Sequence, residues 1–365
     1  MFIGVDKFDL KLFNENPLFK LIVRASKLRL RRLFLLLATI GVIRTGLGFY
    51  GSGMLEVSEN LPKPTATYQS FNLPGPILAK ILGVNTTHEW IFLHLLVLPL
   101  FVYIVGRLLL KKVEGTAERQ FVIIALGCSS MPSVLVSQIG HYDTYLFLWS
   151  SIIALTTGYT SALIVGLFFG ITHFEQSVFM LIALGFLSLA LRSRQIPRLV
   201  LALFASAVMR IGLAVWVDVY DINTPTRWNL LTSRVGVVVH MNLRLIFVHI
   251  FSFYGAAWFF VLSFILISPK KIRLYLILSM ITIPFFGFLF AFDGTRIFSN
   301  LSWAVLITVC VWITRDKEVF GRIKETSPIT LLFFFLTPGI ITHVGEVQVV
   351  YSDIVRKTLE ILRII

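Results

Sequence analysis

Long apolar stretches recur along the whole chain, separated by short polar or basic segments. A helix that crosses a bilayer needs about 20 mostly apolar residues, and fewer when neighbouring helices shield its ends. The pattern therefore predicts an all-α fold, a polytopic transmembrane helical bundle. Its eleven predicted spans are residues 31–50, 88–110, 120–137, 144–157, 160–172, 175–191, 198–216, 245–268, 273–292, 297–314 and 327–342.

The two ends of the chain differ from this central region, residues 31–342, which we expect to form the catalytic domain. Residues 1–30 are polar and basic, and no small-residue cleavage site follows a short apolar core, so we expect a cytoplasmic segment rather than a signal peptide. Residues 343–365 place apolar side chains at helical spacing with charged ones between them. This spacing predicts an amphipathic helix on the outer surface.

The composition excludes several classes of protein. Hydrophobic residues make up 56% of the chain and charged residues only 14%, whereas soluble domains carry about 25% charged residues. The chain is therefore not a soluble globular protein or a disordered tail. Its two cysteines, Cys128 and Cys310, both lie in apolar stretches, so there is no disulfide framework and no CxxC metal site.

The net charge of +14 has a clear location in this topology. Arg29, Arg31 and Arg32 precede the first span, which favours a cytoplasmic N-terminus. The predicted cytoplasmic segments then hold 22 Lys and Arg and eight acidic residues, and the rest of the chain holds 11 of each sign. This bias fits the inner, cytoplasmic membrane, with basic loops against anionic lipid, and needs no nucleic acid as partner.

Ionisable and amide side chains gather in three short turns that this topology places outside. They are His141 and Asp143, then His173, Glu175 and Gln176, then Asp293. Such groups are costly to hold near membrane helices and usually serve a function. We expect the three turns to converge on one outer vestibule that forms an acid–base site.

Each turn also has a plain structural explanation. Asp143 could cap the start of the fourth span, because aspartate favours helix N-termini. His173 and Glu175 could form a polar turn in a tight helical hairpin. Asp293 and Arg296 could be a local ion pair three residues apart, which contributes only a few tenths of a kcal/mol.

Arginine is the second recurring feature. Its planar fork binds phosphate oxygens in pairs and keeps its charge when it is partly buried. We expect an anionic headgroup to meet the exterior Arg227, Arg234, Arg244 and Arg296, with Arg44 and Arg210 in the outer thirds of their spans. For Arg44 and Arg210 the alternative is that the side chain merely extends to the interface.

Short motifs resemble known membrane enzymes. The basic N-terminal segment, the first span and the long outer stretch 68–83 resemble membrane glycosyltransferases of the GT-C type, and are equally similar to Wzy and EpsG-like polysaccharide polymerases such as O-antigen polymerases. Gly140-His141-Tyr142-Asp143 is similar to their Gly-His/Gln-x-Asp turns. Asp293-Gly294-Thr295-Arg296 is similar to an Asp-x-x-Arg element. GT-C enzymes place an aspartate after the first span, where this chain offers only Glu56 or Glu59, so the polymerase resemblance is favoured.

The resemblance implies glycosyl transfer on the outer face, from a polyprenyl-phosphate or polyprenyl-diphosphate sugar donor to a glycan or glycolipid acceptor. His173 with Glu175, or His141 with Asp143, would be the base. Asp293 would orient Arg296 or the acceptor. The arginines, Gln176 and Tyr68 would bind substrate.

Other functions and a metal stay open at this point. Asp143, Glu175 and Asp293 could ligate a divalent metal through oxygen, but with several arginines available for the phosphate we expect no cofactor. The rival function is a transporter or flippase for a lipid-linked sugar or small anion. A third alternative is a structural subunit of an envelope complex.

Overall fold

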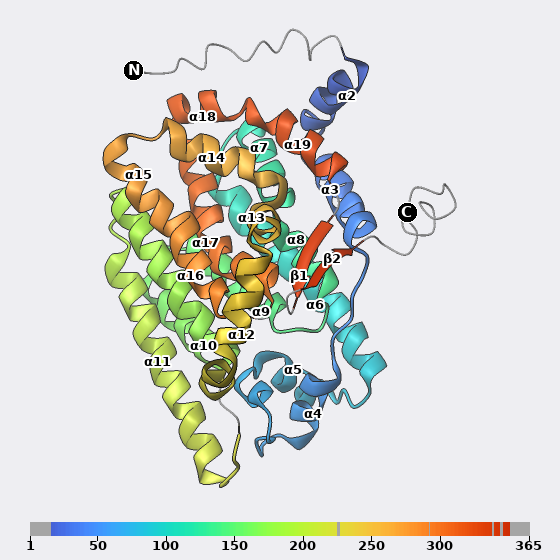
Figure 1. The fold of residues 1–365 in the computed structure, drawn as a ribbon, viewed down its shortest axis with the longest axis vertical. Helices are drawn as coiled ribbons and strands as arrows, with labels where there is room; N and C mark the ends of the chain where they lie inside the picture. Colours follow the sequence, from blue (N-terminus) through green and yellow to red (C-terminus); the bar gives the residue numbers. More distant parts are fainter. Residues whose placement is uncertain (1–15, 225–226, 292, 338, 344–345, 351–365) are drawn as a thin grey trace.

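Figure 1 shows the computed structural model, which describes residues 16–224, 227–291, 293–337, 339–343 and 346–350. The described chain is almost entirely helical, with one short antiparallel hairpin of two strands. Most helices pack into one tall bundle, and a smaller group of short helices lies at its lower end.

The first half of the chain contains the following elements. They are α2 (Pro17–Ser26), α3 (Leu30–Thr45), α4 (Ser52–Asn60), η1 (Tyr68–Phe71), α5 (Pro74–Leu82), α6 (Thr87–Lys112), α7 (Thr116–Gly127), α8 (Ser130–Ser137), α9 (Asp143–Leu155) and α10 (Tyr159–Ala190). The second half continues with α11 (Ile196–Val219), α12 (Arg227–Arg244), α13 (Ile246–Tyr254), η2 (Gly255–Ala257), α14 (Trp258–Ile267), α15 (Lys270–Ile277), the π-helical turn η3 (Leu278–Thr282), α16 (Ile283–Leu289), α17 (Gly294–Arg315), α18 (Lys317–Ile323), α19 (Thr326–Leu336), β1 (Gly339–His343) and β2 (Glu346–Val350).

Several of these helices can cross a membrane. Within the described residues, six helices are long and apolar enough, or seven if the bent pair α7 and α8 forms one span. The protein is therefore a multi-pass membrane protein by its architecture, but the predicted number of eleven spans is not confirmed. α17 is the central helix, because 78% of its apolar window is buried inside the protein.

Two predicted spans end earlier than the apolar pattern suggested. α3 stops at Thr45 because Gly46 takes a left-handed φ of 72°, and the chain then continues in extended form. α19 stops at Leu336, because Thr337 is extended before Pro338, as residues before proline prefer. The chain then forms β1 and β2, so His343 and residues 346–350 of the predicted C-terminal helix 343–365 are strand. Residues 351–365 lie outside the described residues.

The fifth and sixth predicted spans form one element, α10, that breaks at His173, where φ is −165° and ψ is 85°. A Cβ atom on Gly166 would lie 2.8 Å from Ala205, and one on Gly170 would lie 2.7 Å from Met209, so the first part of α10 runs parallel to α11. The last part joins α11 through a short connection and must run antiparallel to it. The end of α10 lies next to the start of α11. An unbroken α10 would place Gly166 about 36 Å from that end, too far away for its contact with Ala205. The chain direction therefore reverses at His173, and the predicted break is confirmed.

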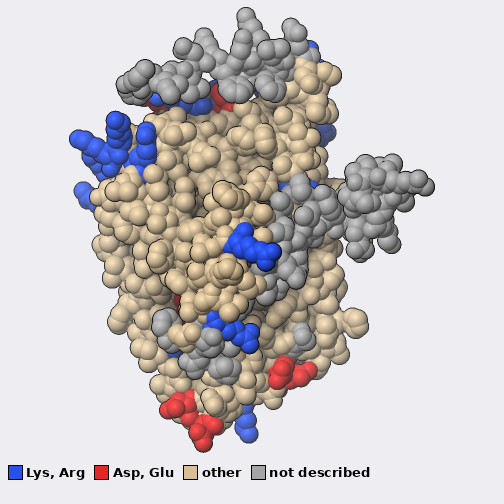
Figure 2. Space-filling view, viewed as in Figure 1, with Lys and Arg blue, Asp and Glu red and all other residues tan. Residues whose placement is uncertain are grey.

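Charge is distributed unevenly between the two ends of the bundle. Lys270 and Lys271 begin α15 in the upper part of Figure 1 and are exposed, whereas the exposed Asp218 and Asp221 lie at the lower end of α11. Figure 2 shows the same contrast, with Lys and Arg gathered at the upper left and Asp and Glu at the lower end. This asymmetry has the form that the positive-inside bias produces.

Candidate active site

The loop before α9 carries the first predicted motif, and a neighbouring extended segment holds it in place. Tyr50 N donates to Ile139 O at 2.8 Å, and Ile139 N donates to Gly48 O at 3.0 Å. Gly140 has a left-handed φ of 92°, and a Cβ atom there would collide with the Tyr50 carbonyl and lie 2.7 Å from Trp90 Nε1. Only glycine fits this close approach, which fixes the position of the next residue, His141.

His141 and Asp143 form a buried hydrogen-bonded pair. His141 Nδ1 lies 2.7 Å from Asp143 Oδ2, and the two residues are 2% and 0% exposed. Arg296 Nη1 lies 3.2 Å from His141 Nε2. Because a guanidinium can only donate, the network assigns the proton of the imidazole to Nδ1 and leaves Nε2 as an acceptor. A carboxylate that orients an imidazole in this way is the arrangement of a general base.

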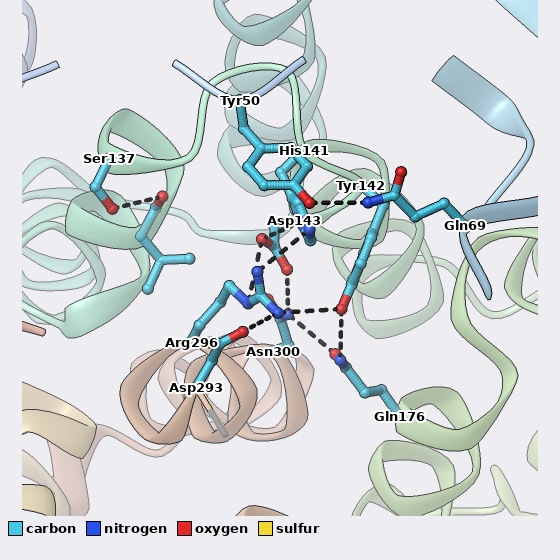
Figure 3. A network of polar contacts seen from close by, with 11 residues as sticks. Tyr50, Gln69, Ser137, His141, Tyr142, Asp143, Gln176, Asp293, Arg296 and Asn300 are labelled. Carbon is cyan, nitrogen blue, oxygen red and sulfur yellow. Dashed lines mark hydrogen bonds and ion pairs between the residues drawn. The ribbon is translucent and has the colours of Figure 1, made fainter. Parts of the chain in front are cut away.

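Arg296 connects this pair to the third predicted turn. It forms an ion pair with Asp293, and its Nε lies 3.7 Å from Asp143 Oδ2. Its Nη2 also lies 3.5 Å from the hydroxyl of Tyr142. Figure 3 shows these side chains pointing toward one another, from the loop before α9 and from the first turns of α17. One cation contacts two carboxylates and so offsets part of the cost of burying their charge.

Two amide side chains complete the cluster. Asn300 Nδ2 donates to Asp143 Oδ1 at 2.6 Å and to Gln176 Oε1 at 3.0 Å. Gln176 Nε2 in turn donates to the hydroxyl of Tyr142 at 3.3 Å. The carboxylate of Asp143 is thereby held from both of its oxygens, and α9, α10 and α17 are tied together at one point.

His173 and Glu175 lie beside this cluster and form their own group. His173 Nδ1 is 3.2 Å from a Glu175 oxygen, and the His173 ring centre is 5.0 Å from that of Tyr142. Glu175 also pairs with Arg210 Nη2 at 3.4 Å, and the Arg210 guanidinium lies 3.8 Å from the ring centre of Phe71. The predicted second turn therefore adjoins the first, and Arg210 reaches it from α11.

The outer segment contributes tyrosines and an amide. The Tyr50 ring lies edge-on to His141, with ring centres 4.6 Å apart, and the Tyr50 hydroxyl accepts from Gln69 Nε2 at 2.8 Å. Tyr68 lies close enough to Tyr50 and Arg296 to interact electrostatically with both. Burial, followed by the neighbouring Tyr68, raises the pKa of Tyr50, so this phenol stays neutral.

The structure does not place the arginines of α12 in the cluster. Arg234 and Arg244 are exposed on that helix and make no ion pair within the described part of the chain. The side chain of Arg227 lies outside the described residues. The structure therefore leaves Arg234 and Arg244 outside the cluster, because a position in the sequence does not reveal which face of a helix a residue occupies. Their contact with an anionic headgroup stays a prediction.

The metal hypothesis gains no support from the described residues, which contain no group of three His, Cys, Asp or Glu side chains able to hold an ion. Asp143 is occupied by His141 and Asn300, and Glu175 faces His173 and Arg210. The carboxylates that the sequence suggested as ligands therefore have other partners.

Sequence reasoning missed Asn300, Tyr50 and Gln69. A signal for Asn300 was present, since it lies four residues after Arg296 and so on the same face of one helix. Gln69 and Tyr50 gave no comparable signal. They lie in short or non-helical segments, and only tertiary packing brings these segments next to His141.

Comparison with known proteins adds no relative to this description. The chain matches no protein-family model, and neither a curated protein nor a solved structure is similar to it.

Proposed function

We propose that the protein is a membrane glycosyltransferase or polysaccharide polymerase that takes its sugar from a polyprenyl-phosphate or polyprenyl-diphosphate donor. The observation that carries the proposal is the His141–Asp143 pair, buried in a helical membrane bundle with Arg296 against the free ring nitrogen. We assign the reaction to the outer face of the cytoplasmic membrane, since the site lies away from the basic end of the bundle.

In the proposed reaction His141 acts as the general base. An acceptor hydroxyl displaces Arg296 from Nε2 and gives its proton to that nitrogen while its oxygen bonds to the anomeric carbon. The bond between that carbon and the phosphate oxygen breaks, and the polyprenyl phosphate leaves with the electron pair. Asp143 stabilises the imidazolium that forms. A base of this kind contributes about 100-fold or more to the rate.

Arg296 and the hydroxyl of Tyr142 are placed to meet the leaving phosphate. Once displaced from His141, the guanidinium can offer two donors to phosphate oxygens. Arg210, next to Glu175, is a second cation within the same group of residues. Fixed donors that face developing negative charge stabilise the transition state.

Two unsatisfied amide oxygens support a polyhydroxylated substrate. Within the described residues, Gln69 Oε1 and Asn300 Oδ1 are buried and have no hydrogen-bond donor. Buried acceptors without a donor are costly, so each is ready to accept from a ligand hydroxyl. Tyr50 and Tyr142 lie beside them and offer aromatic edges and faces on which a sugar ring can pack.

The test is transfer by purified protein given polyprenyl-phosphate and polyprenyl-diphosphate sugars, with products read as a ladder, a single step or none. We expect His141→Ala and Asp143→Asn to lower transfer by about 100-fold or more. The matched control is His240→Ala, an exposed histidine on α12. Gel filtration and thermal unfolding establish that each variant is folded. Full transfer in His141→Ala would refute the assignment.

A lipid-linked sugar or anion transporter is the second candidate, and the break of α10 at His173 favours it. Some transporters bind substrates where the backbone leaves the helical path, and α10 has such a break at His173, beside the Glu175–Arg210 pair. The two functions differ in their need for a base. If labelled substrate crosses a proteoliposome membrane unchanged, and Arg296→Ala stops this while His141→Ala does not, the protein is a transporter.

A further inference from the structure

The short helix α2 lies at the basic end of the bundle, the same end as the start of α15 (Figure 1). The protein contacts it on one side. Phe19 and Ile22 are buried, and Ile22 packs in one apolar cluster with Phe334 of α19. The connection to α3 is also fixed, because Gln120 Nε2 donates to the Leu28 carbonyl at 2.8 Å. The orientation of α2 is therefore set, and its exposed faces point away from the protein.

One of these exposed faces is apolar. Leu18 and Leu21 lie three residues apart, so they are neighbours on the helix, and they are 49% and 61% exposed. A stable protein interface buries about 800 Å² on each partner, far more than two part-exposed leucines offer. Lipid acyl chains need no such minimum area, and the apolar helices of the bundle place them close by.

A second exposed face is basic. Lys20 and Arg24 lie four residues apart on α2, and both are exposed. Between Asn16 and Glu56 the chain contains no acidic residue. Four more exposed cations follow, and within the described part of the chain none of the six forms an ion pair; the four are Lys27, Arg29, Arg31 and Arg32. A cluster of about four to eight Lys and Arg on an amphipathic helix or next to a membrane span attracts anionic lipid.

We propose that α2 is an in-plane membrane helix that binds anionic phospholipid. Leu18 and Leu21 lie among the acyl chains, and Lys20 and Arg24 contact the lipid phosphates of the leaflet at the basic end of the bundle. Apolar and basic strips on one helix are the arrangement of interfacial helices, in which long basic side chains extend to the phosphates. The ligand is bulk phospholipid, so the proposal does not depend on the proposed function.

The test compares full-length protein in nanodiscs of phosphatidylcholine with the same protein in nanodiscs where half of the lipid is phosphatidylglycerol. Hydrogen–deuterium exchange of peptides from α2 is read by mass spectrometry, and peptides from α17 show that each sample is folded. Each cation near an anionic surface contributes about fivefold, so we expect α2 to exchange about 25-fold more slowly with phosphatidylglycerol. Lys20→Gln combined with Arg24→Gln should abolish this difference.

Matched controls separate the site from general effects of charge and polarity. Lys270→Gln combined with Lys271→Gln removes the same charge from exposed positions at the same end of the bundle, and should leave the difference intact. Leu21→Gln should speed the exchange of α2 in phosphatidylglycerol about tenfold, because one leucine no longer packs among acyl chains. Leu274→Gln, at a leucine that is also 61% exposed, should not change it.

Three results would overturn the proposal. They are equal exchange of α2 in the two lipids, equal effects of a variant and its control, and protection that follows the number of protein copies per nanodisc instead of the phosphatidylglycerol. The last result would assign the apolar strip to a second copy of the chain. Sugar transfer plays no part in these measurements, so they are decided separately from the proposed function.

Discussion

Replacing Gly140 by alanine is the sharpest structural perturbation of the candidate site. The left-handed φ of 92° would cost a non-glycine residue about 1–3 kcal/mol. The added Cβ also collides with the Tyr50 carbonyl, which must move and weaken two hydrogen bonds of about 1 kcal/mol each, from Tyr50 N to Ile139 and from Trp90 Nε1. We therefore expect Gly140→Ala to destabilise the protein by about 3 kcal/mol.

Two glycines separate the components of this effect. Gly83 has a φ of 70° but nothing within 4 Å of an added Cβ. The loss of stability in Gly83→Ala therefore measures the cost of the left-handed backbone alone. Gly185 lies inside α10 with free space and an ordinary φ, so Gly185→Ala should be neutral or slightly stabilising. Stability is measured by thermal unfolding in one detergent.

Activity adds a second measure, because moving Tyr50 also moves the His141 ring. A displacement of about 1 Å can cost 100-fold in rate, so transfer should fall that far in Gly140→Ala. If Gly140→Ala were as stable and as active as Gly83→Ala, the packing of Tyr50 over His141 would not be needed, and this reasoning would be refuted.

Three further outcomes follow from the geometry. Asn300→Leu removes the hydrogen bond to Asp143, whereas Gln176→Leu leaves it in place. We therefore expect Asn300→Leu to lower the turnover rate more than Gln176→Leu, as measured by steady-state kinetics, and an equal effect would contradict this. A double-mutant cycle on Glu175 and Arg210 should give a coupling below about 1 kcal/mol, because Glu175 is 40% exposed, and a larger value would mean a buried pair. Gly166→Val should destabilise the α10–α11 contact by about 1–3 kcal/mol in thermal unfolding, and an unchanged midpoint would contradict the close packing there.

The convergence of distant turns could be predicted because each turn ends a helix at the same side of the bundle. His141 and Arg296 lie 155 residues apart in sequence, yet the turn of His141 and Asp143 and the turn of Asp293 and Arg296 are in direct contact in the structure. The break at His173 was also predictable, since a polar cluster interrupted an apolar stretch. In both cases the cost of burying ionisable groups restricts where they can lie.

Other features depend on local backbone preferences or on packing, neither of which hydropathy encodes. The apolar stretch after Thr326 was predicted to cross the membrane, but Pro338 and the β-branched residues that follow favour a strand. The length of α3 was overpredicted, since apolar composition continues past Gly46 while the backbone does not stay helical. Arg234 and Arg244 lie on the outside of α12, which only the orientation of that helix decides.

The central claim, that His141 is a base held by Asp143, is tested most directly by the pH dependence of a single turnover with a polyprenyl-linked sugar. We expect the wild-type rate to fall as the pH is lowered and the imidazole becomes protonated, and we expect His141→Gln to show a small residual rate without this decline. A His141→Gln variant that keeps both the wild-type rate and the same decline at low pH would contradict the account.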